Sequence, residues 1–144
     1  MIHAVLDSTV MVSAFLRQGG VSDILLTHAY ERSFALHLAD DILAETQRIL
    51  LETERIRRRY AYPDDSVHRF IRRLRDIAHL VGPLPPMTGM VERDPNDDMI
   101  IACAIVAATD YTITRDKDLL SLQAWEGITM ITPEDFMAVL RQQG

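Results

Sequence analysis

Four carboxylates, Asp7, Glu45, Asp98 and Asp116, each follow a different predicted element of this 144-residue chain. Asp7 and Asp116 come at or just after the ends of apolar, strand-like runs. Glu45 lies one turn into a predicted helix, and Asp98 lies in the first turn of another. Carboxylates held together repel each other unless a cation lies between them. An all-oxygen set of ligands suits Mg²⁺ or Mn²⁺ better than Zn²⁺. These residue types therefore predict a magnesium or manganese site.

The elements that must position these acids alternate between short apolar strands and helices. The pattern predicts strands at 2–6, 34–39, 80–81, 111–114 and 128–131, with helices between most of them. This alternation is typical of an α/β fold with a mostly parallel sheet and helices on both faces. Because parallel strands end at the same edge of a sheet, all four acids can face one crevice.

Several residues have the chemistry of helix starts. Asp94 before Pro95 and Thr132 before Pro133 each place a capping side chain ahead of a proline at the first helical position. Further starts are expected at Ser22, at Asp40 or Asp41, and at Pro63–Asp65. A short helix or turn is expected at 118–121, and residues 82–89 are a loop by composition.

Each acid also has a purely structural explanation. Asp7 could cap the helix that follows it, Asp98 could complement the dipole of its own helix, and Asp116 could be a turn residue. Four such coincidences at one predicted sheet edge are harder to accept than one metal site. We keep both explanations open and favour the metal.

Composition places the chain among ordinary globular proteins. Its length suits one domain, residues 1–144, and no apolar run is long enough to cross a membrane. A single cysteine, Cys103, excludes an internal disulfide framework, and a cytoplasmic location is expected. The net charge is −6, yet residues 48–75 contain nine arginines against four acids. This segment is either a solvated helical face or a phosphate-binding surface.

Four motifs in order resemble those of PIN-domain ribonucleases, in particular the toxin branch of toxin–antitoxin systems. They are Val5–Leu16, Leu38–Glu45, Arg93–Ala102 and Tyr111–Leu120. The resemblance implies a three-layer α/β/α sandwich with a central, mostly parallel sheet. It also implies metal-dependent cleavage of RNA, in which Asp7, Glu45, Asp98 and Asp116 are both the catalytic and the metal-binding residues.

The resemblance assigns supporting roles as well. Thr114 resembles the family's polar residue after the fourth strand, while Thr9 stands where the toxin branch usually has asparagine and leaves the hydrogen bond to Asp7 open. Asp94, Asp97 and Asp118 belong to the same acidic cluster, with Asp98 preferred to Asp97 because Met-Ile-Ile-Ala follows it. Arg55, Arg57, Arg58 and Arg59 are expected to contact RNA phosphates.

The function that we predict is therefore a Mg²⁺- or Mn²⁺-dependent endoribonuclease, the toxin of a toxin–antitoxin pair. The resemblance implies an antitoxin partner and a homodimer. One alternative is a catalytically weak binding module that acts through protein contacts. Another is an aspartyl-phosphate phosphatase or receiver domain, but Thr9 stands where the phosphatase needs an aspartate, and Lys117 is misplaced for a receiver.

Overall fold

The computed structural model describes residues 1–85 and 95–143, without the side chains of residues 95–97. Within them the strands form one six-stranded sheet in the order β3-β2-β1-β4-β6-β5. The strands are β1 (His3–Leu6), β2 (Ala35–Ala39), β3 (His79–Val81), β4 (Tyr111–Ile113), β5 (Ala124–Trp125) and β6 (Ile128–Ile131). Every neighbouring pair is parallel except β5 with β6. The predicted α/β class is confirmed.

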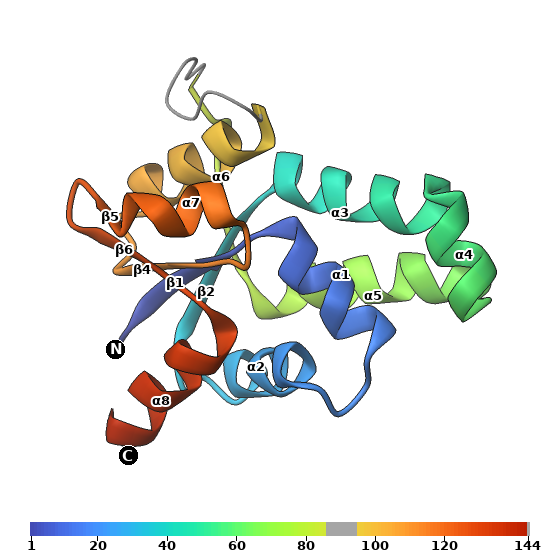
Figure 1. The fold of residues 1–144 in the computed structure, drawn as a ribbon, viewed down its shortest axis with the longest axis horizontal. Helices are drawn as coiled ribbons and strands as arrows, with labels where there is room; N and C mark the ends of the chain where they lie inside the picture. Colours follow the sequence, from blue (N-terminus) through green and yellow to red (C-terminus); the bar gives the residue numbers. More distant parts are fainter. Residues whose placement is uncertain (86–94, 144) are drawn as a thin grey trace.

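Helices cover both faces of this sheet and make the three-layer α/β/α sandwich. They are α1 (Ser8–Leu16), α2 (Val21–Tyr30), α3 (Asp40–Glu52), α4 (Glu54–Tyr60), α5 (Asp64–Ile77), α6 (Pro95–Val106), α7 (Lys117–Leu122) and α8 (Pro133–Gln143). In Figure 1, α6 and α7 lie above the sheet, and α2 and α8 lie below it. Among the described helices, none is long and apolar enough to cross a membrane.

The central strand β1 is buried on both sides. Ala4, Val5 and Leu6 have no exposed surface, because helices pack on each face of the sheet. A run without polar alternation is what a central parallel strand requires. The register pairs Leu6 with Ile113 of β4, so the residues that follow both strands meet at one edge.

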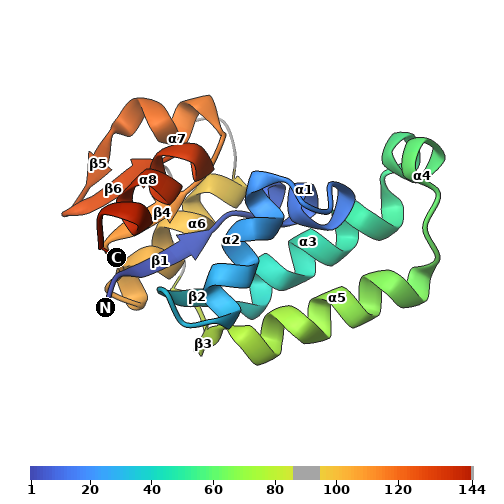
Figure 2. The same cartoon turned by 90° about the horizontal axis from the view of Figure 1, so that it is seen from below.

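Helices α3 and α5 lie side by side and project from the sheet, and α4 joins their far ends (Figure 2). The Arg57 guanidinium holds this corner together. It donates to the carbonyl oxygens of Leu51 (3.3 Å) and Tyr62 (2.9 Å) and pairs with Asp64 at 2.6 Å. We call α3, α4 and α5 the arm.

Three histidines form a row across the first three strands. The ring nitrogens of His3 and His37 lie 2.8 Å apart, and the His37 ring stacks on His79 with 5.0 Å between centroids. The register explains the row, since His37 pairs with His79 on β3, while His3 lies two residues from the partner of His37 on β1. Burial, followed by repulsion from His3 and His79, lowers the pKa of His37.

Most predicted helix starts are confirmed. Pro95 begins α6, Pro63 precedes α5, and the Thr132 hydroxyl accepts from the Asp135 amide (3.2 Å) at the start of α8. Asp94 and residues 86–89 of the predicted loop lie outside the described residues.

Two predicted helix caps are wrong. Ser22 does not cap α2, because the helix already starts at Val21 and the Ser22 hydroxyl is buried. Neither Asp40 nor Asp41 caps α3, because both lie inside its first turn, after Ala39. The separate short helix α4 and the antiparallel strand β5 were not predicted.

Candidate active site

Asp7 lies at the carboxyl end of β1 and is only 4% exposed. Its Oδ1 accepts from the Thr9 hydroxyl (2.6 Å) and from the Val10 amide (3.0 Å), so it caps α1. Its Oδ2 accepts from the Thr114 hydroxyl, which is also buried. Thr9 therefore supplies a hydrogen bond to Asp7 although it is not the asparagine usual in the toxin branch.

Burial raises the pKa of Asp7, and the hydrogen bonds from Thr114, Thr9 and Val10 only partly oppose this effect. Burial at this position therefore disfavours the ionised form of the carboxyl group. Because Oδ1 already accepts from the Thr9 hydroxyl and the Val10 amide, Oδ2 is the oxygen that suits a cation.

Thr114 joins Asp7 to Asp116. The Thr114 hydroxyl, which donates to Asp7, also accepts from the Asp116 amide at 3.0 Å. The Asp116 Oδ1 in turn caps α7, accepting from the amides of Asp118 (2.8 Å) and Leu119 (3.2 Å). No hydrogen bond to the Asp116 Oδ2 occurs among the described residues. This second oxygen is therefore available to a ligand.

Glu45 and Asp98 come from α3 and α6. Helix α6 packs on β1, on β4 and on α3. Asp98 lies in the first turn of α6 and is 8% exposed. The Glu45 side chain is 13% exposed and pairs with Arg48, three residues along α3, at 2.6 Å.

The remaining acidic positions fall into two groups. Asp118 is half-buried at the start of α7, next to Asp116. Asp94 and the side chain of Asp97 lie outside the described residues.

Within the described part of the chain, no group of three or more histidine, cysteine, aspartate or glutamate side chains is arranged to hold a metal ion. The four-carboxylate metal site therefore stays a prediction.

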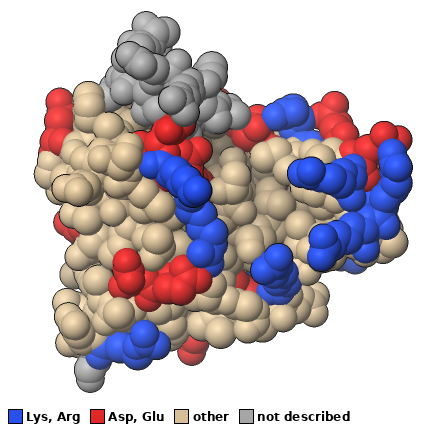
Figure 3. Space-filling view, in the orientation of Figure 1, with Lys and Arg blue, Asp and Glu red and all other residues tan. Residues whose placement is uncertain are grey.

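The four arginines expected to contact RNA have different surroundings. Arg57 is committed to the corner of the arm. Arg58 pairs with Glu54 at 3.1 Å on the surface. Arg55 and Arg59 have no ion-pair partner within the described residues, and the Arg59 guanidinium lies 5.6 Å from the centre of the Tyr60 ring. Arginine side chains gather over α3 and α4 at the right of Figure 3, since the single lysine, Lys117, lies on α7.

Sequence reasoning missed one residue of this edge, Arg48. Its guanidinium contacts both oxygens of Glu45, at 2.6 and 3.2 Å, and so competes with any other ligand of that carboxylate. The spacing of three residues on a helix was a usable signal, since such pairs are neighbours on one helical face.

Comparison with known families agrees with this geometry. Residues 3–118, which include β1, β4 and all four acids, match the PIN domain. No curated protein matches the chain in a sequence comparison. The match spans most of the chain and the whole edge just described, so this chain belongs to the PIN domain family.

Proposed function

We propose that this chain is a metal-dependent endoribonuclease and that it acts as the toxin of a toxin–antitoxin pair. PIN domains are generally nucleases, which supports hydrolysis of nucleic acid. The observation that carries the proposal is the buried Asp7 carboxylate, fixed by the Thr114 hydroxyl beside Asp116. A cation bound at this place would offset the cost that burial imposes on the ionised Asp7 carboxylate.

Asp7 and Asp116 are the proposed principal ligands of Mg²⁺ or Mn²⁺, through the carboxylate positions that remain on each Oδ2. When bound, such an ion lowers the pKa of a coordinated water and stabilises the charge that develops on a phosphodiester. Thr9, Val10 and Thr114 fix the orientation of Asp7 by hydrogen bonds. Asp98 and Glu45 complete the acidic edge.

Glu45 has a second proposed role, because Arg48 holds its carboxylate in one orientation. A carboxylate fixed in this way can accept a proton from the attacking water. It can do so while it is paired with Arg48 or after that ion pair has opened. The antitoxin partner and the homodimer rest on the resemblance to the toxin branch alone.

The direct test is cleavage of a mixed RNA pool with Mg²⁺, Mn²⁺ or EDTA. Asp7→Asn and Asp116→Asn should each abolish cleavage, and Glu45→Gln and Asp98→Asn should reduce it. Asp110→Asn is the matched control, because Asp110 precedes β4 at the opposite end of the sheet, where it accepts from the His3 amide. It should leave the rate unchanged.

Full cleavage of RNA by both Asp7→Asn and Asp116→Asn would show that these two carboxylates do not form the catalytic site. If RNA stays intact with either metal, while the protein binds a partner and all variants are folded, the alternative of a binding module would replace the nuclease.

A further inference from the structure

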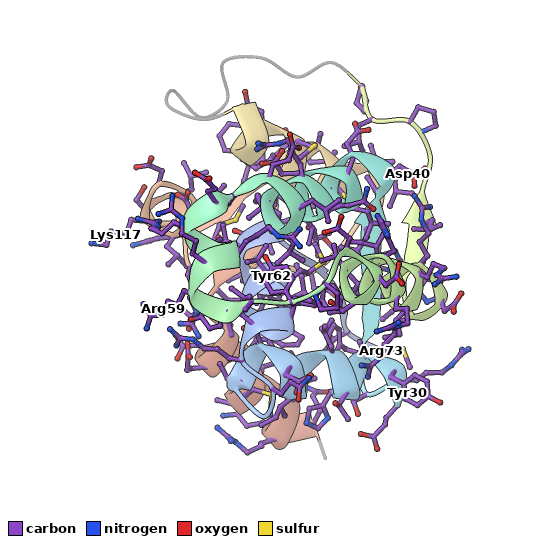
Figure 4. The ribbon with its side chains drawn as sticks, turned by 90° about the vertical axis from the view of Figure 1, so that its right-hand side faces the viewer. Tyr30, Asp40, Arg59, Tyr62, Arg73 and Lys117 are labelled. Atoms are coloured by element: carbon purple, nitrogen blue, oxygen red, sulfur yellow. The ribbon has the colours of Figure 1, made fainter. Side chains whose placement is uncertain are left out.

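A groove of about 470 Å³ lies between the end of α1, the connection from α4 to α5, and α5 itself. It is separate from the acidic edge, which lies at the start of α1. Its principal lining side chains are aromatic or basic: Phe15, Tyr60, Tyr62, Arg69, Phe70 and Arg73. Figure 4 faces this side of the molecule, where Tyr62 lies between Arg59 and Arg73 in the view.

The floor of the groove is a cluster of aromatic side chains. The Phe15 ring makes edge contacts with Tyr62 (4.9 Å between centroids) and Phe70 (5.2 Å). The Tyr62 hydroxyl donates to the Leu50 carbonyl at 2.6 Å, and the Arg57 guanidinium lies 5.0 Å from its ring centre. These contacts fix the positions of the three aromatic rings that form the apolar floor of the groove.

The rim of the groove carries the positive charges of two arginine side chains. Arg69 and Arg73 are exposed and four residues apart, hence on one face of α5. Neither has an ion-pair partner among the described residues, whereas Arg75 on the same helix pairs with Asp40 at 2.6 Å. Asp23 is the one acid lining the groove, and its Oδ2 already accepts from the Gly19 amide at 2.8 Å.

Two guanidinium groups above an aromatic surface, without ion-pair partners in the described part of the chain, match the chemistry of single-stranded nucleic acid. Such sites pair a basic track for the phosphates with rings on which bases stack. The half-buried Tyr60 ring, with Arg59 near one face, is the natural stacking partner. Because the net charge is −6, a polyanion is attracted to a local basic surface rather than to the protein as a whole.

We propose that this groove binds single-stranded RNA beside the cleavage site, with phosphates on Arg69 and Arg73 and a base against Tyr60. The proposal rests on the nuclease function proposed above. Helix α1 connects the two places, since Phe15 lies eight residues beyond Asp7, or about 12 Å along the helix axis. A few nucleotides of single strand span that distance, so one RNA can occupy both.

The test measures binding without cleavage. A fluorescein-labelled 12-nucleotide oligouridine is titrated with protein in EDTA, and its anisotropy is followed at several salt concentrations. Arg69→Ala and Arg73→Ala should each weaken binding several-fold and lower the salt slope by about 0.7, the value for one lost phosphate contact on a single strand. Tyr60→Leu should weaken binding about five-fold or more.

Arg72→Ala is the matched control, because Arg72 is exposed on the same helix but does not line the groove. It should leave affinity and slope unchanged. Equal losses in Arg72→Ala and Arg73→Ala would overturn the proposal in favour of diffuse charge. So would absence of RNA binding, binding of duplex RNA as tight as that of the single strand, or tighter binding of oligothymidine DNA than of RNA. Tight binding of an oligoglutamate peptide that Arg69→Ala and Arg73→Ala weaken, while both variants leave RNA binding unchanged, would assign the groove to an acidic protein segment instead.

Cleavage assays with metal separate this proposal from the nuclease function. If Asp7→Asn abolishes cleavage but Arg73→Ala changes neither affinity nor KM, the nuclease stands and the groove fails. If Arg73→Ala weakens RNA binding but neither the wild type nor any variant cleaves RNA, the groove still binds a single strand and the proposed nuclease function is wrong.

Discussion

The Thr114 hydroxyl donates to the carboxylate of Asp7, a residue 107 positions earlier in the chain. The same hydroxyl accepts from the Asp116 amide, so a single side chain fixes both proposed metal ligands. The bond is possible because β1 and β4 are neighbours in the sheet and end together. Thr114 is thus a positioning residue for the acidic edge.

Thr114→Val should destabilise the protein by about 1–3 kcal/mol, because it leaves a buried carboxylate oxygen and the Asp116 amide without this partner. Cleavage should fall with it. Thr112→Val is the control, since the Thr112 hydroxyl is buried on the same strand and has no hydrogen-bond partner among the described residues. That variant should be neutral or slightly more stable in urea unfolding. Equal losses of unfolding free energy in both variants would mean that the hydrogen bonds of the Thr114 hydroxyl do not contribute to stability.

Asp7→Asn should melt at or above the wild-type temperature in EDTA. Burial raises the pKa of Asp7 in the folded state, so the ionised wild-type carboxylate carries a cost of burial that asparagine avoids. This advantage should shrink as the pH falls through the raised pKa and the wild-type carboxyl becomes neutral. Thermal scans between pH 4 and pH 8 measure it. A variant that melts lower at pH 7 would show that the hydrogen bonds outweigh burial.

The wild type should lose stability as the pH falls through about 6.5, the ordinary pKa of histidine. Because the pKa of His37 is lowered in the folded state, the unfolded chain binds the proton more readily there, and stability rises with pH. His37→Gln should flatten this dependence in thermal scans from pH 7.5 to pH 5.5. His68→Gln, at an exposed position on α5, should not. Parallel curves for wild type and His37→Gln would contradict the assignment.

Arg57→Ala and Arg58→Ala should differ although they are neighbours. Arg57 loses two bonds to backbone carbonyls, the Asp64 pair and the ring contact with Tyr62, which should cost about 1.5–3 kcal/mol. Arg58 loses one exposed ion pair with Glu54, which contributes about 0.5 kcal/mol or less. Urea unfolding of both variants tests this difference. Similar small losses would mean that the corner holds without Arg57.

The parts of the fold that follow local rules could be predicted from the sequence. The apolar runs gave β1, β4 and β6, and the prolines at 95 and 133 gave the starts of two helices. The position of Asp7 and Thr114 at one edge of the sheet follows from parallel topology, whereas the pairing of β1 with β4 is known only from the structure.

The parts set by distant contacts could not be predicted. Nothing local ends α3 at Glu52, because neither glycine nor proline is near, and the corner depends on Arg57 reaching Tyr62 and Asp64. The aromatic groove combines Phe15 of α1 with Phe70 of α5, which are far apart in the chain, so no short sequence window contains it. Strand β5 has two residues, too few to show any periodicity.

The pairing of β1 with β4 also sets the order in which the acidic edge can form during protein synthesis. Asp7 leaves the ribosome 107 residues before Thr114, an interval of about 5–20 s at ordinary rates of translation. Throughout that interval the nascent chain has neither the hydroxyl that orients Asp7 nor the carboxylate of Asp116. A chain that cuts RNA would thus be synthesised largely in an unassembled form, beside the messenger and ribosomal RNA that surround it.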